Sequence, residues 1–171
     1  MDELVLGMLR LGPAHGYDLR KRVRAELGSA WRVASSQLYA SLRRLEERGE
    51  VVAALEKVPD APPRRVYTLT AAGENRFAAW LRSGQEGQQR ARGAFLVRLY
   101  FLSRFAPDHL ALYIAQEREA LCRRRARLLA QRTGGDPFLE AVRRHRLSQV
   151  EAGLGWLDEL AGLFGLRKEG A

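Results

Sequence analysis

Apolar residues recur at intervals of three and four along most of the chain, which is the spacing of amphipathic helices. The pattern predicts helices at 3–11, 14–27, 35–48, 71–83, 94–105, 108–131 and 138–164. Between the third and fourth of these, β-favouring residues on both sides of a proline-rich turn predict two strands, at 51–57 and 64–69. We therefore expect a mainly α fold with one small β-hairpin.

The predicted helix at 35–48 has an apolar face and a polar face. Leu38, Leu42 and Leu45 form one apolar stripe, and Ser35 or Ser36 is expected to cap the first turn. The outer face carries Ser36, Gln37, Ala40, Arg43, Arg44 and Glu47. Because the hairpin that follows carries Arg64 and Arg65 beside its turn, the whole has the outline of a winged helix-turn-helix, a module that most often binds duplex DNA.

The stretch 83–93 is polar and rich in glycine and glutamine, which favours a domain boundary there. We expect a winged helix-turn-helix domain at 1–84 and a helical dimerisation domain at 94–166. The last two helices have about 25 residues each and span on the order of 35–40 Å, more than so small a domain can cover. A second copy is the simpler partner for their apolar stripe, which comprises Leu110, Ile114, Leu121, Leu128, Val142, Trp156 and Leu160.

Charge supports a polyanionic partner without identifying it. The chain has 29 Lys and Arg against 20 Asp and Glu, a formal net charge of +9. Both halves of the chain are basic, however, and an arginine-rich composition is also typical of a GC-rich genome. Charge alone therefore does not decide the function.

Several classes of protein are disfavoured. No run approaches the roughly 18 apolar residues that cross a membrane, and the acidic start of the chain argues against export. The single cysteine, Cys122, fits a reducing cytoplasm, and we favour a packing role for it over a redox sensor flanked by arginines. His15, His109 and His145 lack metal-ligand spacing, and no glycine-rich phosphate loop or G-x-S-x-G is present. We expect no catalytic residue, no metal and no cofactor.

The segments LGPAHGYDLRKRV, WRVASSQLYASLRRLEERGEV and PPRRVYTLTAAG occur in this order within about the first 80 residues. Together they resemble the PadR family of bacterial transcriptional regulators. The resemblance implies a winged-helix DNA-binding dimer, usually a repressor, that releases its operator when a small molecule or other signal arrives.

By this resemblance Tyr39 corresponds to the tyrosine of the recognition helix, and Gly16 and Tyr17 to the glycine and tyrosine of the second helix. Ser35, Ser36 and Ala40 stand where family members often have Pro, Gly and Pro. Ser36, Gln37 and Arg43 suit base edges, whereas Tyr39, Arg44, Arg64 and Arg65 suit phosphates or the minor groove. The predicted DNA-binding residues are Ser35, Ser36, Gln37, Tyr39, Ala40, Arg43, Arg44, Arg64 and Arg65.

The sequence thus predicts a cytoplasmic homodimer, associated with the nucleoid when bound, whose two helices lie about 34 Å apart on a palindromic operator in duplex DNA. An apolar or aromatic effector has a possible pocket in Trp80, Phe95, Tyr100, Phe101 and Trp156, although these aromatic residues are more often core. The alternative is a winged helix that holds a protein partner without binding specific DNA.

Overall fold

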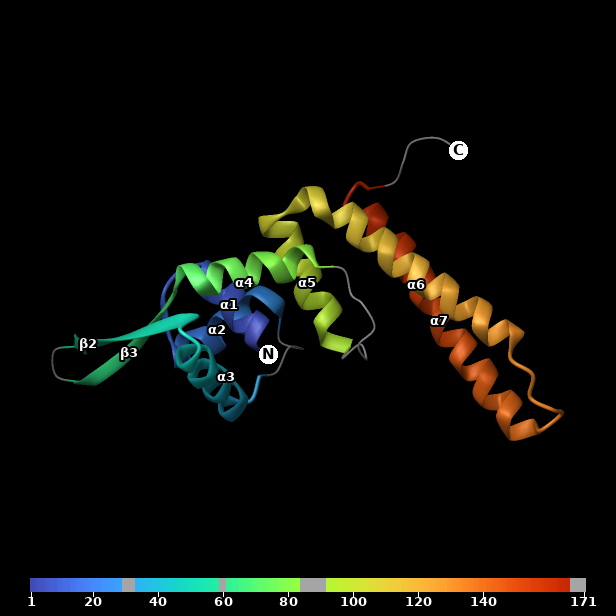
Figure 1. The fold of residues 1–171 in the computed structure, drawn as a ribbon, viewed down its shortest axis with the longest axis horizontal. Coiled ribbons are helices and arrows are strands. Elements are labelled where there is room, and N and C mark those ends of the chain that lie inside the picture. Colours follow the sequence, from blue (N-terminus) through green and yellow to red (C-terminus); the bar gives the residue numbers. More distant parts are fainter. Residues whose placement is uncertain (29–32, 59–60, 84–91, 167–171) are drawn as a thin grey trace. The chain divides into compact units, whose positions relative to one another are not determined.

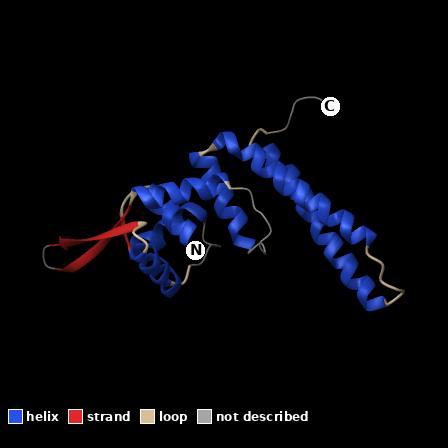
Figure 2. Cartoon of the chain, in the orientation of Figure 1, coloured by secondary structure: helices blue, strands red, loops and turns tan. Residues whose placement is uncertain are grey.

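The computed structural model describes residues 1–28, 33–58, 61–83 and 92–166. The chain divides into two compact units, Met1–Phe105 and Ala106–Ala171. Helices make up most of both units, and the strands form one small sheet (Figure 2). This confirms the predicted mainly α fold with a β-hairpin. Within the described ranges no helix combines the length and the apolar character needed to cross a membrane.

Helix α1 (Asp2–Arg10) is the centre of the first unit. Every residue from 4 to 9 is buried, because α2 (Gly16–Leu27), α3 (Ser35–Glu47) and α4 (Ala71–Arg82) all pack against it (Figure 1). The sequence pattern predicts a helix here but does not show that it is enclosed on all sides. A helix enclosed by others is buried around its whole circumference.

The sheet joins two distant parts of the first unit. Strands β2 (Val51–Val58) and β3 (Ala61–Leu69) are antiparallel, with an irregularity between Glu56 and Val58, and residues 59–60 of their turn lie outside the described part. The short strand β1 (Ala14–His15) pairs with the other edge of β3, giving the order β1-β3-β2. Residues 14–15 were predicted as helix, because a strand of two residues has no periodicity of its own.

A side chain caps the start of α4, whereas none caps the start of α3. Thr70 caps α4 by accepting a hydrogen bond from the amide of Gly73 at 3.2 Å. The predicted serine cap of α3 is wrong, since the N-cap residue is Ala34 and no side chain caps this end. Ser35 is already the first helical residue, and its hydroxyl accepts a hydrogen bond from Arg20 at 3.0 Å.

Helix α5 (Arg92–Phe105) belongs to the first compact unit. A Cβ atom on Gly7 would lie 2.2 Å from the ring of Phe101, so α1 and α5 meet at a position that admits only glycine. Phe101 also packs edge-on against Phe77 of α4, with ring centroids 5.1 Å apart. The predicted domains at 1–84 and 94–166 remain predictions, and 84–91 of the predicted linker lies outside the described residues.

The second unit is a helical hairpin. A short 3-10 turn, η1 (Pro107–His109), leads into α6 (Leu110–Ala130), and α7 (Pro137–Leu163) returns along it (Figure 1). Asp136 caps α7 by accepting hydrogen bonds from the amides of Phe138 and Leu139. Gly153 of α7 faces Leu121 of α6, where a Cβ would come within 3.1 Å of the leucine side chain.

Several residues predicted to form a dimer interface are already buried in the single chain. These are Leu110, Ile114, Leu128 and Leu160. Leu121 and Val142 are half-buried, whereas Trp156 is exposed. The apolar stripe on α6 is thus covered in part by α7, which the sequence pattern alone did not distinguish from a second copy. The dimer interface itself stays a prediction.

Candidate nucleic-acid interface

Helix α3 presents the two faces that the sequence predicts. Leu38, Leu42 and Leu45 are fully buried against the first unit. Ser36, Gln37 and Arg43 are exposed on the outer side, and Ala40 is half-buried among them. Arg43 is widely exposed, with 76% of its side chain accessible and an ion pair to Glu47 at 3.8 Å.

Tyr39 stands between two shallow hollows in this surface. The first, of about 500 Å³, is lined by His15, Gly16, Tyr17, Asp18, Tyr39, Arg64, Arg65 and Tyr67. The second, of about 420 Å³, is lined by Ser36, Tyr39, Ala40, Arg43, Glu46, Arg65 and Tyr67. Residues from the start of α2, the outer face of α3 and strand β3 therefore share one continuous surface.

Close packing on Gly16 fixes the position of Tyr39. A Cβ atom on Gly16 would lie 2.6 Å from the tyrosine ring, which rests directly on the backbone at the start of α2. The ring nevertheless stays half exposed. The glycine and tyrosine that the sequence places 23 positions apart are thus in contact, and the glycine is required by the close approach of the ring.

The hairpin is tied to the rest of the surface by polar contacts. His15 spans both strands, with Nδ1 3.2 Å from the carbonyl oxygen of Arg65 and Nε2 3.1 Å from the carboxylate of Glu56. The guanidinium of Arg65 donates to Glu46 of α3 at 2.5 Å. Burial raises the pKa of Tyr67, which lies beneath this pair, and the Glu46 carboxylate raises it further while Arg65 opposes it. Arg64 is exposed.

Arg44 has a structural partner. Asp2 accepts hydrogen bonds from Arg44 at 2.7 Å, from Ser41 at 2.5 Å and from Arg48 at 2.5 Å. Burial favours the neutral form of Asp2, but these hydrogen bonds outweigh it and hold the pKa of the carboxyl well below its usual range. Arg44 therefore anchors α3 to α1. Its predicted role as a DNA contact stays a prediction.

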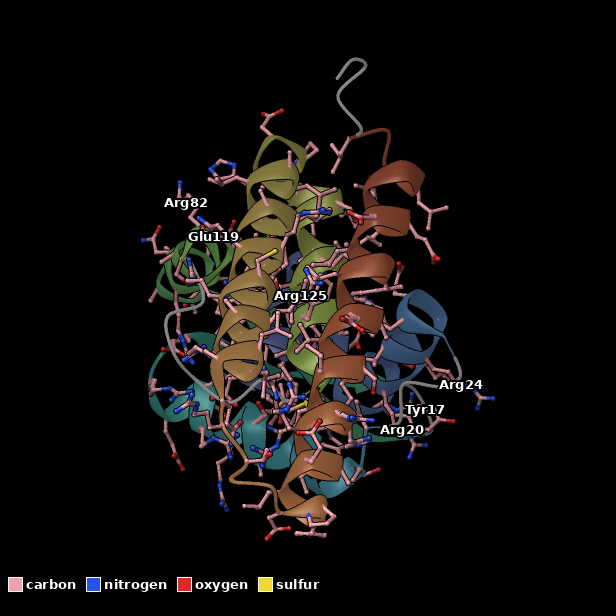
Figure 3. All side chains as sticks on the ribbon, turned by 90° about the vertical axis from the view of Figure 1, so that its right-hand side faces the viewer. Tyr17, Arg20, Arg24, Arg82, Glu119 and Arg125 are labelled. Carbon is pink, nitrogen blue, oxygen red and sulfur yellow. The ribbon has the colours of Figure 1, made fainter. Side chains whose placement is uncertain are left out.

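The structure adds a basic strip on α2 that the predicted contact set leaves out. Tyr17, Arg20 and Arg24 lie on the outer side of this helix (Figure 3), and the Lys21 ammonium lies 4.5 Å from the centre of the Tyr17 ring. From the sequence, this basic run is either a solvated face, the usual case, or a surface that approaches phosphates. Arg22 in the same run turns inward and donates to the carbonyl oxygens of Met8 and Gly12.

The aromatic residues predicted for an effector pocket occupy different places. Trp80, Tyr100 and Phe101 belong to the ring cluster of α4 and α5, where Phe101 is fully buried. Burial and a hydrogen bond from its hydroxyl to Glu26 raise the pKa of Tyr100 to about 12. Phe95 is half-buried on α5, and Trp156 lies in the second unit. The pocket remains a prediction.

Other candidate chemistry is limited. Cys122 is exposed, so the packing role expected for it is wrong. Among the residues described, no three His, Cys, Asp or Glu side chains come together in a group that could hold a metal ion.

Comparison with known proteins gives the same family as the sequence motifs. Residues 5–79 match the profile of the transcriptional regulator PadR-like family. The chain is 30% identical over 99 residues to the negative transcriptional regulator PadR of Bacillus subtilis, a match that spans 58% of this chain and 54% of that protein. It is 25% identical over 167 residues to the probable transcriptional regulator Rv1176c of Mycobacterium tuberculosis, spanning 85% and 87% of the two chains.

Among solved structures, the chain is similar to Bacillus subtilis PadR in complex with operator DNA. The identity is 22%, the match covers 95% of this chain and 98% of that one, and the TM-score is 0.47. The first of the two sequence relatives is matched over about half of its length. The match to the family profile confirms the resemblance seen in the sequence motifs. The profile and both relatives are those of transcriptional regulators and not of enzymes.

Proposed function

We propose that this protein is a sequence-specific DNA-binding regulator that acts as a homodimeric repressor, because residues 5–79 match the profile of the PadR-like family of transcriptional regulators. The observation that supports it best is the continuous surface around Tyr39. There the exposed face of α3, the start of α2 and the basic strand β3 adjoin one another. Such a surface suits a duplex, which presents base edges in a groove bordered by phosphates on both sides.

The side chains divide between the two kinds of contact. Gln37 and Arg43 project from the outer face of α3 and have the geometry to read adenine and guanine edges in the major groove. Arg64 on the hairpin and the α2 strip of Tyr17, Lys21 and Arg24 are suited to phosphates. Phosphate contacts supply affinity that falls steeply with salt, whereas base contacts supply sequence preference.

A homodimer fits the exposed apolar side chains of the second unit. Leu112, Trp156 and Leu163 remain accessible on the hairpin of α6 and α7, where a second copy would cover them. A two-fold dimer presents two copies of α3 to a palindrome whose half-sites lie one helical turn apart. Release by a small apolar or aromatic effector would change the spacing of these two helices. The protein would act in the cytoplasm.

The alternative, a winged helix that holds a protein partner, predicts no salt-dependent binding to duplex DNA. The experiment that separates the two is binding to DNA taken from upstream of the gene that encodes this protein, at two salt concentrations. We expect protection of a palindromic site and a large loss of affinity at the higher salt. Equal, weak binding to every sequence would contradict the proposal.

The contact between Gly16 and Tyr39 gives a separate prediction. In Gly16→Ala the new methyl group displaces the Tyr39 ring, whose outer atoms are free to move, so the fold should persist while the ring leaves its place. We expect affinity for the upstream DNA to fall by about tenfold, which corresponds to about 1.4 kcal/mol. Fluorescence anisotropy with a labelled duplex measures it.

Gly155→Ala is the matched control, because a Cβ at this helical glycine meets no atom within 4 Å. Its affinity for DNA should equal that of the wild type. If Gly16→Ala also binds DNA like the wild type, DNA binding does not require the Tyr39 ring to be held in this position.

A further inference from the structure

The second hollow beside Tyr39 contains a carboxylate, Glu46, among lining residues that are otherwise basic or neutral. Ser36, Tyr39, Arg43 and Glu46 follow one another at intervals of three and four, so they form one stripe along the exposed side of α3. All four line the same hollow beside Arg65 of the hairpin. A negative charge at the end of this stripe repels a phosphate backbone, and its presence therefore needs an explanation beyond solubility.

Glu46 engages the arginine of β3 that is nearest to the stripe. The Nη2 atom of Arg65 lies 2.5 Å from Oε1 of Glu46, so a charge-assisted hydrogen bond joins the guanidinium to the carboxylate. The guanidinium carbon also lies 5.5 Å from the centre of the Tyr67 ring. The backbone of the same residue is held as well, because its carbonyl oxygen contacts His15. Arg65 is thus fixed at both its main chain and its side chain, although 53% of the side chain is exposed.

We propose that Glu46 is a specificity-determining residue that holds Arg65 away from the DNA backbone and so weakens binding to non-operator DNA. The inference rests on the proposed function. On random DNA the protein binds through phosphate contacts alone. Its affinity there depends most on arginine and lysine side chains that can move to reach a phosphate in any register. An arginine that is already paired with a carboxylate makes no such adjustment.

On the operator the balance is different. Base contacts from Gln37 and Arg43 fix the register of α3. The affinity of this complex therefore depends less on one additional mobile side chain that contacts a phosphate. Releasing Arg65 therefore raises affinity for random DNA more than affinity for the operator. The relevant quantity is the ratio of the two, since any operator competes with a large excess of other sequence.

A purely structural role for the pair predicts something else. Exposed ion pairs contribute little to stability, so a tie between α3 and β3 would be lost with a small change in melting temperature and no gain in DNA affinity. DNA affinity, measured beside the melting temperature, therefore separates the two roles.

The test uses the full chain with Glu46→Gln, which keeps the size of the side chain and removes its charge. At about 0.1 M salt one additional phosphate contact raises affinity by roughly eightfold and steepens the salt dependence by about 0.9 in the logarithmic slope. We expect this gain on a duplex of scrambled sequence and a smaller gain on the upstream DNA. Glu47→Gln is the charge-matched control, since Glu47 is paired only loosely with Arg43 at 3.8 Å, and it should gain less.

The second comparison repeats Glu46→Gln in a chain that already carries Arg65→Gln. If the gain comes from release of Arg65, it should largely vanish in this background. An equal gain in both backgrounds would overturn the inference, as would a Glu46→Gln variant that binds scrambled DNA no better than wild type or Glu47→Gln. Failure of the wild-type protein to bind any duplex would overturn the proposed function as well, and it is visible before any variant is compared.

Discussion

Replacing Phe101 by alanine is expected to lower the free energy of unfolding by about 3–5 kcal/mol. The ring is completely buried, lies against the backbone of Gly7, and packs on Phe77 at 5.1 Å and on Phe105 at 6.0 Å between centroids. Its removal leaves a cavity at the point where α1, α4 and α5 meet, and rigid neighbours on three helices cannot close around it. Urea denaturation followed by circular dichroism measures the change.

Leu96→Ala, on the same helix, is the control. Leu96 is exposed, so its truncation should change the free energy of unfolding by no more than about 0.5 kcal/mol. If Phe101→Ala and Leu96→Ala are equally mild, α5 is not part of the core of the first unit.

The second large effect is expected from Asp2→Asn. The Asp2 carboxylate accepts hydrogen bonds from Ser41, Arg44 and Arg48. The substitution keeps the shape of this side chain but removes its negative charge. Hydrogen bonds to a charged group contribute about 1.5–3 kcal/mol, so we expect a loss of stability in that range. Because α3 is also released from α1 at this end, affinity for DNA should fall with it.

The effect depends on pH in a defined direction. The pKa of Asp2 in the folded protein lies below its ordinary value of 3.8, so the carboxylate stabilises the fold fully above that value. The stabilisation is lost as the pH falls below 3.8 toward the folded-state pKa. The difference in stability between wild type and Asp2→Asn should therefore be largest near neutral pH and shrink in strong acid. Exposed Asp108→Asn is the control. A difference that does not change with pH would contradict the assigned role.

Local patterns were enough to predict every element of the fold that has a periodicity of its own. The stripe of Leu38, Leu42 and Leu45 identifies the buried face of α3, because a helix of 3.6 residues per turn places these positions together. The hairpin followed from β-favouring residues around a turn. Strand β1 was missed, since its two residues are strand only because β3 lies beside them.

The partners of the arginines were not predictable in the same way. Arg43, Arg44 and Arg65 look equivalent in sequence, yet Arg44 binds Asp2 at the start of the chain and Arg65 binds Glu46. These pairs join residues separated by 42 and 19 positions, and only the packing of α3 on α1 and on the hairpin brings them together. The contact of Gly16 with Tyr39 is of the same kind.

The central claim is that α3 reads DNA through its exposed face, and binding to the upstream DNA by Arg43→Ala tests it most directly. The matched variant is Arg124→Ala, which removes an exposed arginine from α6 in the second unit. A lost base contact costs about 1–3 kcal/mol, so Arg43→Ala should bind the protected site roughly five- to 150-fold more weakly and lose preference over scrambled sequence. Arg124→Ala should keep both affinity and preference. If Arg43→Ala binds as the wild type does, or if both variants weaken binding to all sequences alike, α3 is not the element that reads the operator.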